Sequence, residues 1–375
     1  GIGSSHGPML VTETDIWDAR VPFDKVVRHA WRNGSYSFDE LVTARKDENL
    51  GRMVSKQVWD EQQVRCQSSI EKLADAFADA KIDVAVVIGN DQMEIFDERL
   101  IPAFAVHYGE TITNYEFSDE RMAAVPVGVA PAIPGYIPKG GAEYPGHPEL
   151  ARHIIRQVMD DNFDVAAMNG MPKPETPHAW GFIFRRIMRD NPVPTVMVTV
   201  NAFYPPNQPS VRRCYDLGKS IVKAIESWRS DARVALIASG GLTHFVVDEG
   251  IDRTFLDALR NKDIDAVEAL GEGVFQDGTS ELKNWVPVAG AMAEVGLEPD
   301  VLDYVPCDRS CQGVPRLVGA AVPPTFPKQN DHLVLGALSL WIESAERPTR
   351  FHDGLWNRQR FVSDSAYRRN FADLV

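Results

Sequence analysis

The chain has 375 residues, of which 44% are hydrophobic and 25% are charged. This composition is that of an ordinary globular protein, without the shortage of apolar residues that marks disorder. The length allows one large domain or two ordinary ones, because single cores stop growing at about 250–300 residues. A net charge of −14 without clustered Lys and Arg argues against nucleic acid as a partner.

Two further counts narrow the class of protein. No run of 18 apolar residues occurs, so we expect no membrane partner and a cytoplasmic location. The four cysteines have the spacing of neither a disulfide framework nor a zinc site; they are Cys66, Cys214, Cys307 and Cys311.

Apolar strands alternate with amphipathic helices along the chain. Helices are predicted where apolar residues recur three and four positions apart, at 68–80, 147–161, 210–230 and 253–263. Strands are predicted in the β-rich runs 81–89, 195–203 and 233–241. Near-continuous apolar strands indicate a sheet that is covered on both faces. The expected fold class is therefore α/β, with a central mixed sheet and helices on both faces.

The boundaries that we expect define one large domain with an arm. Residues 1–330 form the catalytic domain, with a helical insertion at 17–60 and a long loop rich in Pro and Gly at 119–146. Residues 331–375 begin with an apolar helix and form a C-terminal helical arm. Its six aromatic residues suggest a homodimer interface, although packing on its own subunit fits as well.

Four of the nine histidines lie at strand ends or in loops flanked by Gly and Pro, where α/β proteins keep their chemistry. They are His6, His107, His178 and His244. Small neighbours around His6 and His244 allow a close approach to a ligand. The segment GIGSSHG lacks the third glycine and the preceding strand of a dinucleotide loop, so His6 is better interpreted as a ligand at the end of the first strand.

Seven motifs occur in a fixed order: GIGSSHGPM, GNDQMEIF, GHPEL, MNGM, NAFYPP with RRCYDLGKSI, SGGLTHF and GTSELKNWVPVAGAM. In this order they resemble the class III extradiol ring-cleavage dioxygenases, the family of the protocatechuate 4,5-dioxygenase catalytic subunit and of gallate and methylgallate dioxygenases. The resemblance covers residues 1 to about 320.

The resemblance implies roles for particular residues. His6 and Glu281 would be metal ligands, His244 the acid/base, and His178 a residue that orients the substrate or the oxygen adduct. Two imidazoles and one carboxylate that leave adjacent positions open are the donor set of non-haem Fe(II) oxygenases. Histidine suits the proton transfers, because both of its protonation states are accessible near neutral pH. Three residues match a stretch near the substrate pocket, namely Asn201, Tyr204 and Arg213.

One position departs from the family pattern. The second histidine ligand is expected just after the strand at 81–89, where this sequence has Gln92. Gln92 is our candidate for the third metal ligand; its neutral amide oxygen donates less strongly than imidazole. The alternatives are that Glu94 takes the place of Gln92, or that His107 or His178 supplies a nitrogen ligand. A further alternative is that the chain holds no catalytic iron.

The function that we predict is a non-haem Fe(II)-dependent extradiol dioxygenase that acts on a catechol, gallate or related hydroxylated aromatic with O2. A Gln92 ligand would also allow Mn or Zn. The alternatives are a metal-dependent hydrolase or lyase on the same fold, or a non-catalytic binding protein.

Overall fold

A computed structural model describes residues 1–125, 128–310 and 315–319. The described residues all belong to one unit of the chain. The arm predicted at 331–375, its suggested dimer interface and the domain boundary at 330 lie outside the described residues. Among the described residues, no helix has both the length and the apolar character needed to cross a membrane.

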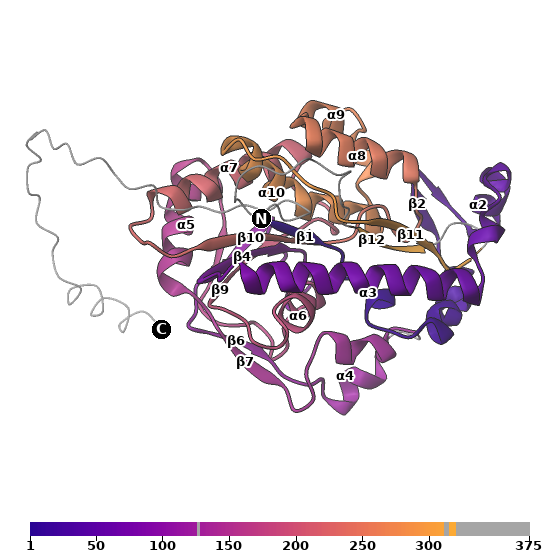
Figure 1. Cartoon of the computed structure of the whole chain (residues 1–375), viewed down its shortest axis with the longest axis horizontal. Helices are drawn as coiled ribbons and strands as arrows, with labels where there is room; N and C mark the ends of the chain where they lie inside the picture. The colour runs from indigo at the N-terminus through magenta and orange to yellow at the C-terminus, as the bar shows by residue number, and fades with distance from the viewer. Residues whose placement is uncertain (126–127, 311–314, 320–375) are drawn as a thin grey trace, which may run out of the picture. The chain divides into compact units, whose positions relative to one another are not determined.

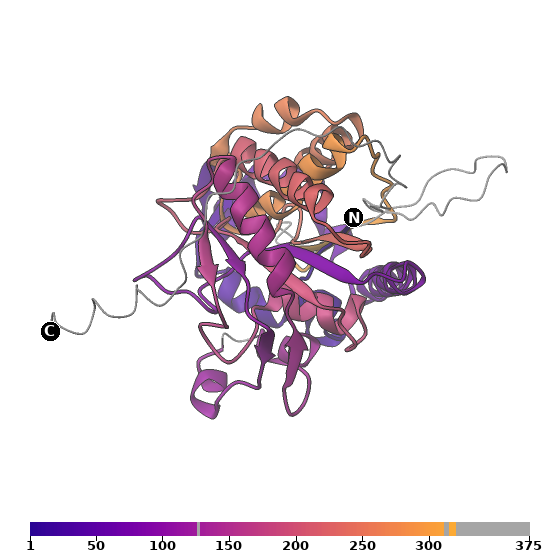
Figure 2. The ribbon, with the colours of Figure 1, turned by 90° about the vertical axis from the view of Figure 1, so that its left-hand side faces the viewer.

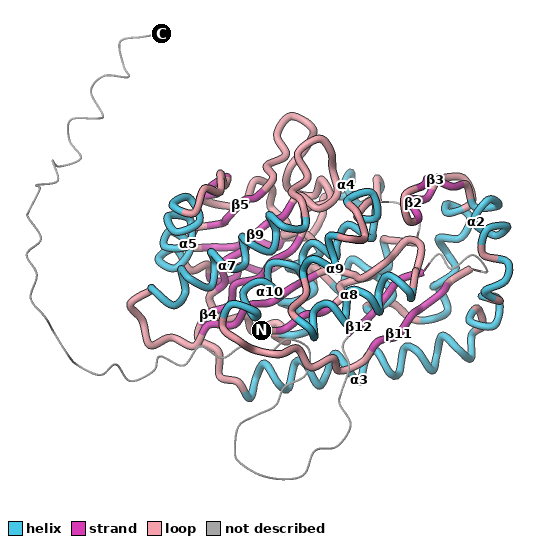
Figure 3. Tube along the Cα trace, turned by 90° about the horizontal axis from the view of Figure 1, so that it is seen from above, coloured by secondary structure: helices cyan, strands magenta, loops and turns pink. Residues whose placement is uncertain are grey.

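A six-stranded sheet forms the centre of this unit. Its order is β1-β10-β4-β9-β5-β8, and every neighbouring pair is parallel except β9 with β5. Figure 3 shows β5, β9 and β4 running side by side. The strands are β1 Ile2–Ser4, β4 Val84–Gly89, β5 Phe104–His107, β8 Ala166–Met168, β9 Thr195–Val200 and β10 Val234–Ser239.

The central strands are buried on both faces, and alternate side chains enter different cores. Val84, Val86 and Ile88 of β4 belong to one hydrophobic cluster. Ala85 and Val87, between them, belong to the other. This alternation is the period-two geometry of a strand, and it explains why the sequence is continuously apolar here.

Helices cover both faces, so the predicted fold class is confirmed. One face packs against α5 (Pro148–Asp160), α7 (Val211–Ser227) and α10 (Leu282–Glu294). The other packs against α3 (Lys56–Asp79), α6 (His178–Phe182) and the π-helix Ile183–Ile187. Figure 2 shows α3 end-on, on the opposite side of the sheet from the orange α10.

The remaining elements lie around this body. The shorter helices are α1 Val21–Asp24, α2 Phe38–Ala44, α4 Asp119–Ala123, α8 Glu249–Asn261 and α9 Ile264–Glu268. Antiparallel pairs are formed by β2 His29–Trp31 with β3 Gly34–Tyr36, β6 Thr111–Asn114 with β7 Ala142–Pro145, and β11 Tyr304–Asp308 with β12 Pro315–Gly319.

The segment 17–60, predicted as helical, contains the β2–β3 hairpin as well as short helices. The two residues of its turn are Arg32 and Asn33, and Arg32 has the positive φ, 54°, that a two-residue hairpin turn requires. The helix predicted at 68–80 is the second half of α3, which begins twelve residues earlier, after the N-cap Ser55.

Candidate metal centre

The site lies at one edge of the sheet, because parallel strands bring their carboxyl ends together. β1, β4 and β10 end at Ser4, Gly89 and Ser239. The residues that follow each strand therefore meet at this edge. They include His6, Gln92 and His244, which are 86 and 152 residues apart in the sequence.

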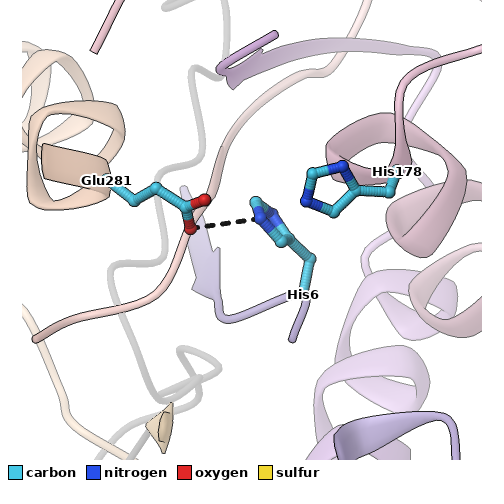
Figure 4. A group of neighbouring side chains, drawn as sticks. All are labelled: His6, His178 and Glu281. Carbon is cyan, nitrogen blue, oxygen red and sulfur yellow. Dashed lines mark ion pairs between the residues drawn. The ribbon is translucent and has the colours of Figure 1, made fainter. Parts of the chain in front are cut away.

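Three side chains come together there as a candidate metal centre. Ligand atoms of His6, His178 and Glu281 all lie within 4.8 Å of one another. Figure 4 shows the three side chains converging from separate parts of the chain. His178 is the first residue of α6, and Glu281 immediately precedes α10. His6 and Glu281 are almost fully buried.

Hydrogen bonds fix which nitrogen of His6 carries the proton. The hydroxyl of Ser239 donates to the carbonyl oxygen of Ala179 at 2.6 Å, so its oxygen accepts from His6 Nδ1 at 3.0 Å. Burial, with His178 and His244 nearby, lowers the pKa of His6 despite the attraction of Glu281, so the ring is neutral. A neutral ring protonated on Nδ1 carries a lone pair on Nε2.

This lone pair faces a carboxylate, which makes the pair a fitting cation site. Nε2 of His6 lies 3.1 Å from Oε2 of Glu281 and has no hydrogen-bond partner among the described residues. Two lone pairs at this distance repel one another unless a positive charge lies between them. The donor set therefore fits a bound metal ion.

Three donors hold the Glu281 carboxylate in place. Gln92 Nε2 donates to Oε1 at 2.8 Å, and Asn90 Nδ2 lies 3.4 Å from the same oxygen. The backbone N–H of Gly241 donates to Oε2 at 2.8 Å. Gln92 thus faces Glu281 through its amide nitrogen, whereas a metal ligand would use its oxygen.

Glu94 orients His178 in the same way. Its two carboxylate oxygens accept from the backbone N–H of His178 at 3.1 Å and from Nδ1 at 2.7 Å. Burial opposes the charge of Glu94, but His178 lowers its pKa below the usual value. Because Nδ1 donates to a carboxylate, Nε2 is the nitrogen that can act as a ligand. Carboxylates commonly orient metal-bound histidines in this manner.

His244 lies on the other side of the same carboxylate. Its Nδ1 donates to the carbonyl oxygen of Leu242 at 2.8 Å, and its Nε2 lies 3.4 Å from Oε2 of Glu281. In the neutral ring, Nε2 is therefore unprotonated. It can accept a proton beside an anion that stabilises the resulting cation.

The start of α10 supports this arrangement. Asn284 donates to the backbone oxygen of Ser239 at 2.8 Å and to Asn90 at 2.7 Å. The indole of Trp285 donates to the carbonyl oxygen of Gly240 at 2.7 Å. A Cβ at Gly3 would lie 2.2 Å from the Trp285 ring, so glycine is needed there. The start of the helix therefore gives Glu281 a rigid support.

The other predicted site residues lie in the loop after β9 and on α7. Buried Asn201 bonds to Tyr204 and Asn207 and so shapes the loop after β9. Burial, with Asp91 and Glu94 nearby, raises the pKa of Tyr204 to about 12. Arg213 is exposed on α7, with its guanidinium 4.9 Å from the centre of the Phe163 ring.

His107, one of the alternatives for a nitrogen ligand, is not a member of the cluster. It is fully buried in β5, and burial lowers its pKa to about 4. Sequence reasoning missed Asn90, Ser239 and Asn284, which hold ligands in place. Their position at the end of a strand, directly after one, or one turn after Glu281 is the signal that could have found them.

A cavity of about 670 Å³ opens beside the cluster. Gln92, Glu94 and His178 line it, and the segments 17–60 and 119–146 contribute Arg20 and six further residues to its wall. The other lining residues are Pro8, Arg20, Met93, Phe117, Arg121, Ala124, Val125, Val129, Ile133, Tyr136, Lys173 and Phe245.

Comparison with protein families identifies the family of the chain. Residues 53–307 match the model of the catalytic LigB subunit of aromatic ring-opening dioxygenase. The chain belongs to this family, and the resemblance found in the sequence is confirmed. The matched region contains His178, His244 and Glu281, while His6 precedes it.

One curated relative and one solved structure show the range of similarity. The chain is 34% identical over 126 residues to gallate dioxygenase of Pseudomonas putida, a match that covers 31% of this chain and 36% of the relative. The match thus spans about a third of that protein. The crystal structure of an uncharacterized protein of Escherichia coli K12 matches 68% of this chain and 92% of its own, with 14% identity and a TM-score of 0.44.

Proposed function

We propose that the protein is an extradiol dioxygenase that uses Fe(II) and O2 to open a hydroxylated aromatic ring of the catechol or gallate type. The observation that carries this proposal is the buried cluster of two imidazoles and one carboxylate, in which a lone pair of His6 faces Glu281 at 3.1 Å. Membership in a family of aromatic ring-opening dioxygenases supports it.

His6, His178 and Glu281 would hold the metal. This is the donor set of non-haem Fe(II) oxygenases, and a second nitrogen from His178 favours iron over the Mn or Zn that a Gln92 ligand would allow. When bound, Fe(II) supplies adjacent open positions for two ring hydroxyls and O2, and a path for electrons between them. We propose that Gln92 fixes the Glu281 carboxylate and that Glu94 fixes the ring of His178.

The chain itself moves the protons. His244 Nε2, unprotonated in the neutral ring, would accept a phenolic proton from the substrate and later return it to the cleaved product. The imidazolium formed between these steps is stabilised by Glu281 at 3.4 Å. Apolar side chains of the cavity, among them Phe117, Val129 and Ile133, would exclude water from the ring.

Oxygen uptake tests the function. The protein is loaded with Fe(II) without air and then mixed with O2 and a panel of catechols and gallates. We expect stoichiometric uptake and the absorbance of a ring-opened semialdehyde or dicarboxylate. No uptake with any member would refute the proposal, and turnover without O2, with Zn or Mn in place of iron, would identify a hydrolase or lyase instead. The cytoplasmic location remains a prediction.

Two substitutions separate the proposed ligand His178 from the proposed positioning residue Gln92. We expect His178→Ala to lower the affinity for Fe(II) as much as His6→Ala does, because each removes a nitrogen donor. Gln92→Met should lower the affinity for Fe(II) about tenfold, which is the effect of losing a group that orients a ligand. Titration of metal-free protein with Fe(II) measures both. Equal and large losses for Gln92→Met and His6→Ala would place Gln92 among the ligands.

A further inference from the structure

The cavity beside the metal centre extends well beyond the space that one aromatic ring needs. Gln92 and His178 line the end of the cavity that is next to the metal centre. An aromatic ring bound at the metal centre therefore occupies only this end of the cavity. A single-ring acid is about the size of a tyrosine side chain. The cavity volume of about 670 Å³ lies in the range of pockets that enclose much larger ligands.

Two chemistries make up the rest of the wall. Five of the lining residues are apolar and follow one another closely in the chain from 117 to 133: Phe117, Ala124, Val125, Val129 and Ile133. Three are cationic, namely Arg20, Arg121 and Lys173. An apolar wall with a few charged groups is the usual design for a ligand that has a hydrophobic body and a polar handle.

Arg20 is a cation without an acidic partner of its own. In residues 1–125 and 128–310, no carboxylate forms an ion pair with it. Asp24, which attracts it, is already bound by Arg309 through two hydrogen bonds of 2.7 and 2.8 Å. Burial first, and then Arg309, lower the pKa of Arg20, with Asp24 opposing them. A half-buried charge of this kind favours an anion in the adjacent space.

The other two cations differ in how far they are neutralised. Arg121, on α4, pairs with Glu175 and stacks on the ring of Phe117 at 4.5 Å. Lys173 donates to the carbonyl oxygen of Met93 at 3.2 Å and, within the described part of the chain, forms no ion pair. Arg20 and Lys173 are therefore the cations available to an anionic ligand.

We propose that the substrate is a two-ring aromatic acid. Its dihydroxylated ring occupies the metal centre, its second ring packs on the apolar wall, and its carboxylate is bound by Arg20 with support from Lys173. This inference rests on the proposed function and names the substrate class for the same site.

Three probes test it: a dihydroxybiphenyl carboxylic acid, its carboxamide and a dihydroxybenzoic acid. Their Kd values are measured by calorimetry on the iron-loaded protein without O2, and their kcat/KM values by oxygen uptake. We expect the biphenyl acid to bind at least about tenfold more tightly than the single-ring acid. Arg20→Gln should raise the Kd of the biphenyl acid about 10- to 100-fold, the range for a charged hydrogen bond, and leave the Kd of the carboxamide almost unchanged.

Two further variants serve as controls. Arg229→Gln removes an exposed arginine that does not line the cavity and should change no Kd, whereas Arg20→Lys should restore part of the affinity. Cleavage of the single-ring acid without preference for the biphenyl acid overturns the substrate class and leaves the function standing. Equal weakening of acid and carboxamide by Arg20→Gln also overturns it. If no probe binds and none causes oxygen uptake, both the substrate class and the proposed function are wrong.

Discussion

Replacement of Glu281 by glutamine is expected to deprive the protein of its metal and to lower kcat/KM by more than about 100-fold. Loss of a group that merely orients a ligand lowers metal affinity or activity about 10- to 100-fold. Glu281 supplies the negative charge of the centre itself, so its loss should have a larger effect. With the amide oxygen still accepting from the N–H of Gly241, the new amide nitrogen takes the place of Oε1, where Gln92 can turn its own amide oxygen toward it. The metal-free variant should therefore unfold near the temperature of the metal-free parent.

Glu294→Gln is the matched control for this change. Glu294 ends the same helix, is half exposed and pairs with Lys219 at 3.4 Å. This variant should keep its iron and its activity. Metal analysis after dialysis, oxygen uptake and thermal unfolding are the measurements. A Glu281→Gln protein that holds one iron per chain would contradict the assignment of the centre.

Replacement of His244 by glutamine is expected to leave the metal in place and to lower kcat by about 100- to 10,000-fold, the usual contribution of a positioned acid or base. Glutamine can occupy similar space and accept a hydrogen bond, but it cannot carry a proton between substrate and product. KM and iron content should stay near the parent values, because His244 contacts the carboxylate of Glu281 rather than completing the cluster.

His153→Gln provides the comparison. His153 lies on α5 and bonds to Ser227 at 2.9 Å, so the substitution changes a histidine outside the site. Single-turnover measurements on iron-loaded protein separate binding from chemistry. If His244→Gln loses iron together with activity, or turns over at the parent rate, His244 is not the acid/base.

The sheet and its helices follow from the sequence because their signal is local. Val84 to Gly89 is continuously apolar, and a strand buried on both faces needs this pattern. The β2–β3 hairpin was not predicted, because strands of only three residues are too short to show a clear alternation of apolar and polar residues. The first half of α3 was not predicted because it is mostly polar.

The site was predictable where a residue type sits at a strand end in a recognisable motif, as with His6 and His244. The partners of these residues were not, because they depend on register. β1 pairs with β10 so that Ser4 lies beside Ser239, and this brings the Ser239 hydroxyl to a histidine 233 residues away. The contact of Gln92 with Glu281 depends on how an amide is turned, which no spacing encodes.

The candidate ligands come from the beginning, the middle and the far end of the described chain, at positions 6, 178 and 281. An ion held by all three acts as a cross-link that exists only in the native state. Because the ion binds only the native state, a free metal concentration of about 100 times the Kd adds roughly 2.7 kcal/mol to the free energy of unfolding. Iron supply would then govern the lifetime of the protein as well as its turnover, since metal-poor molecules open more often to proteases.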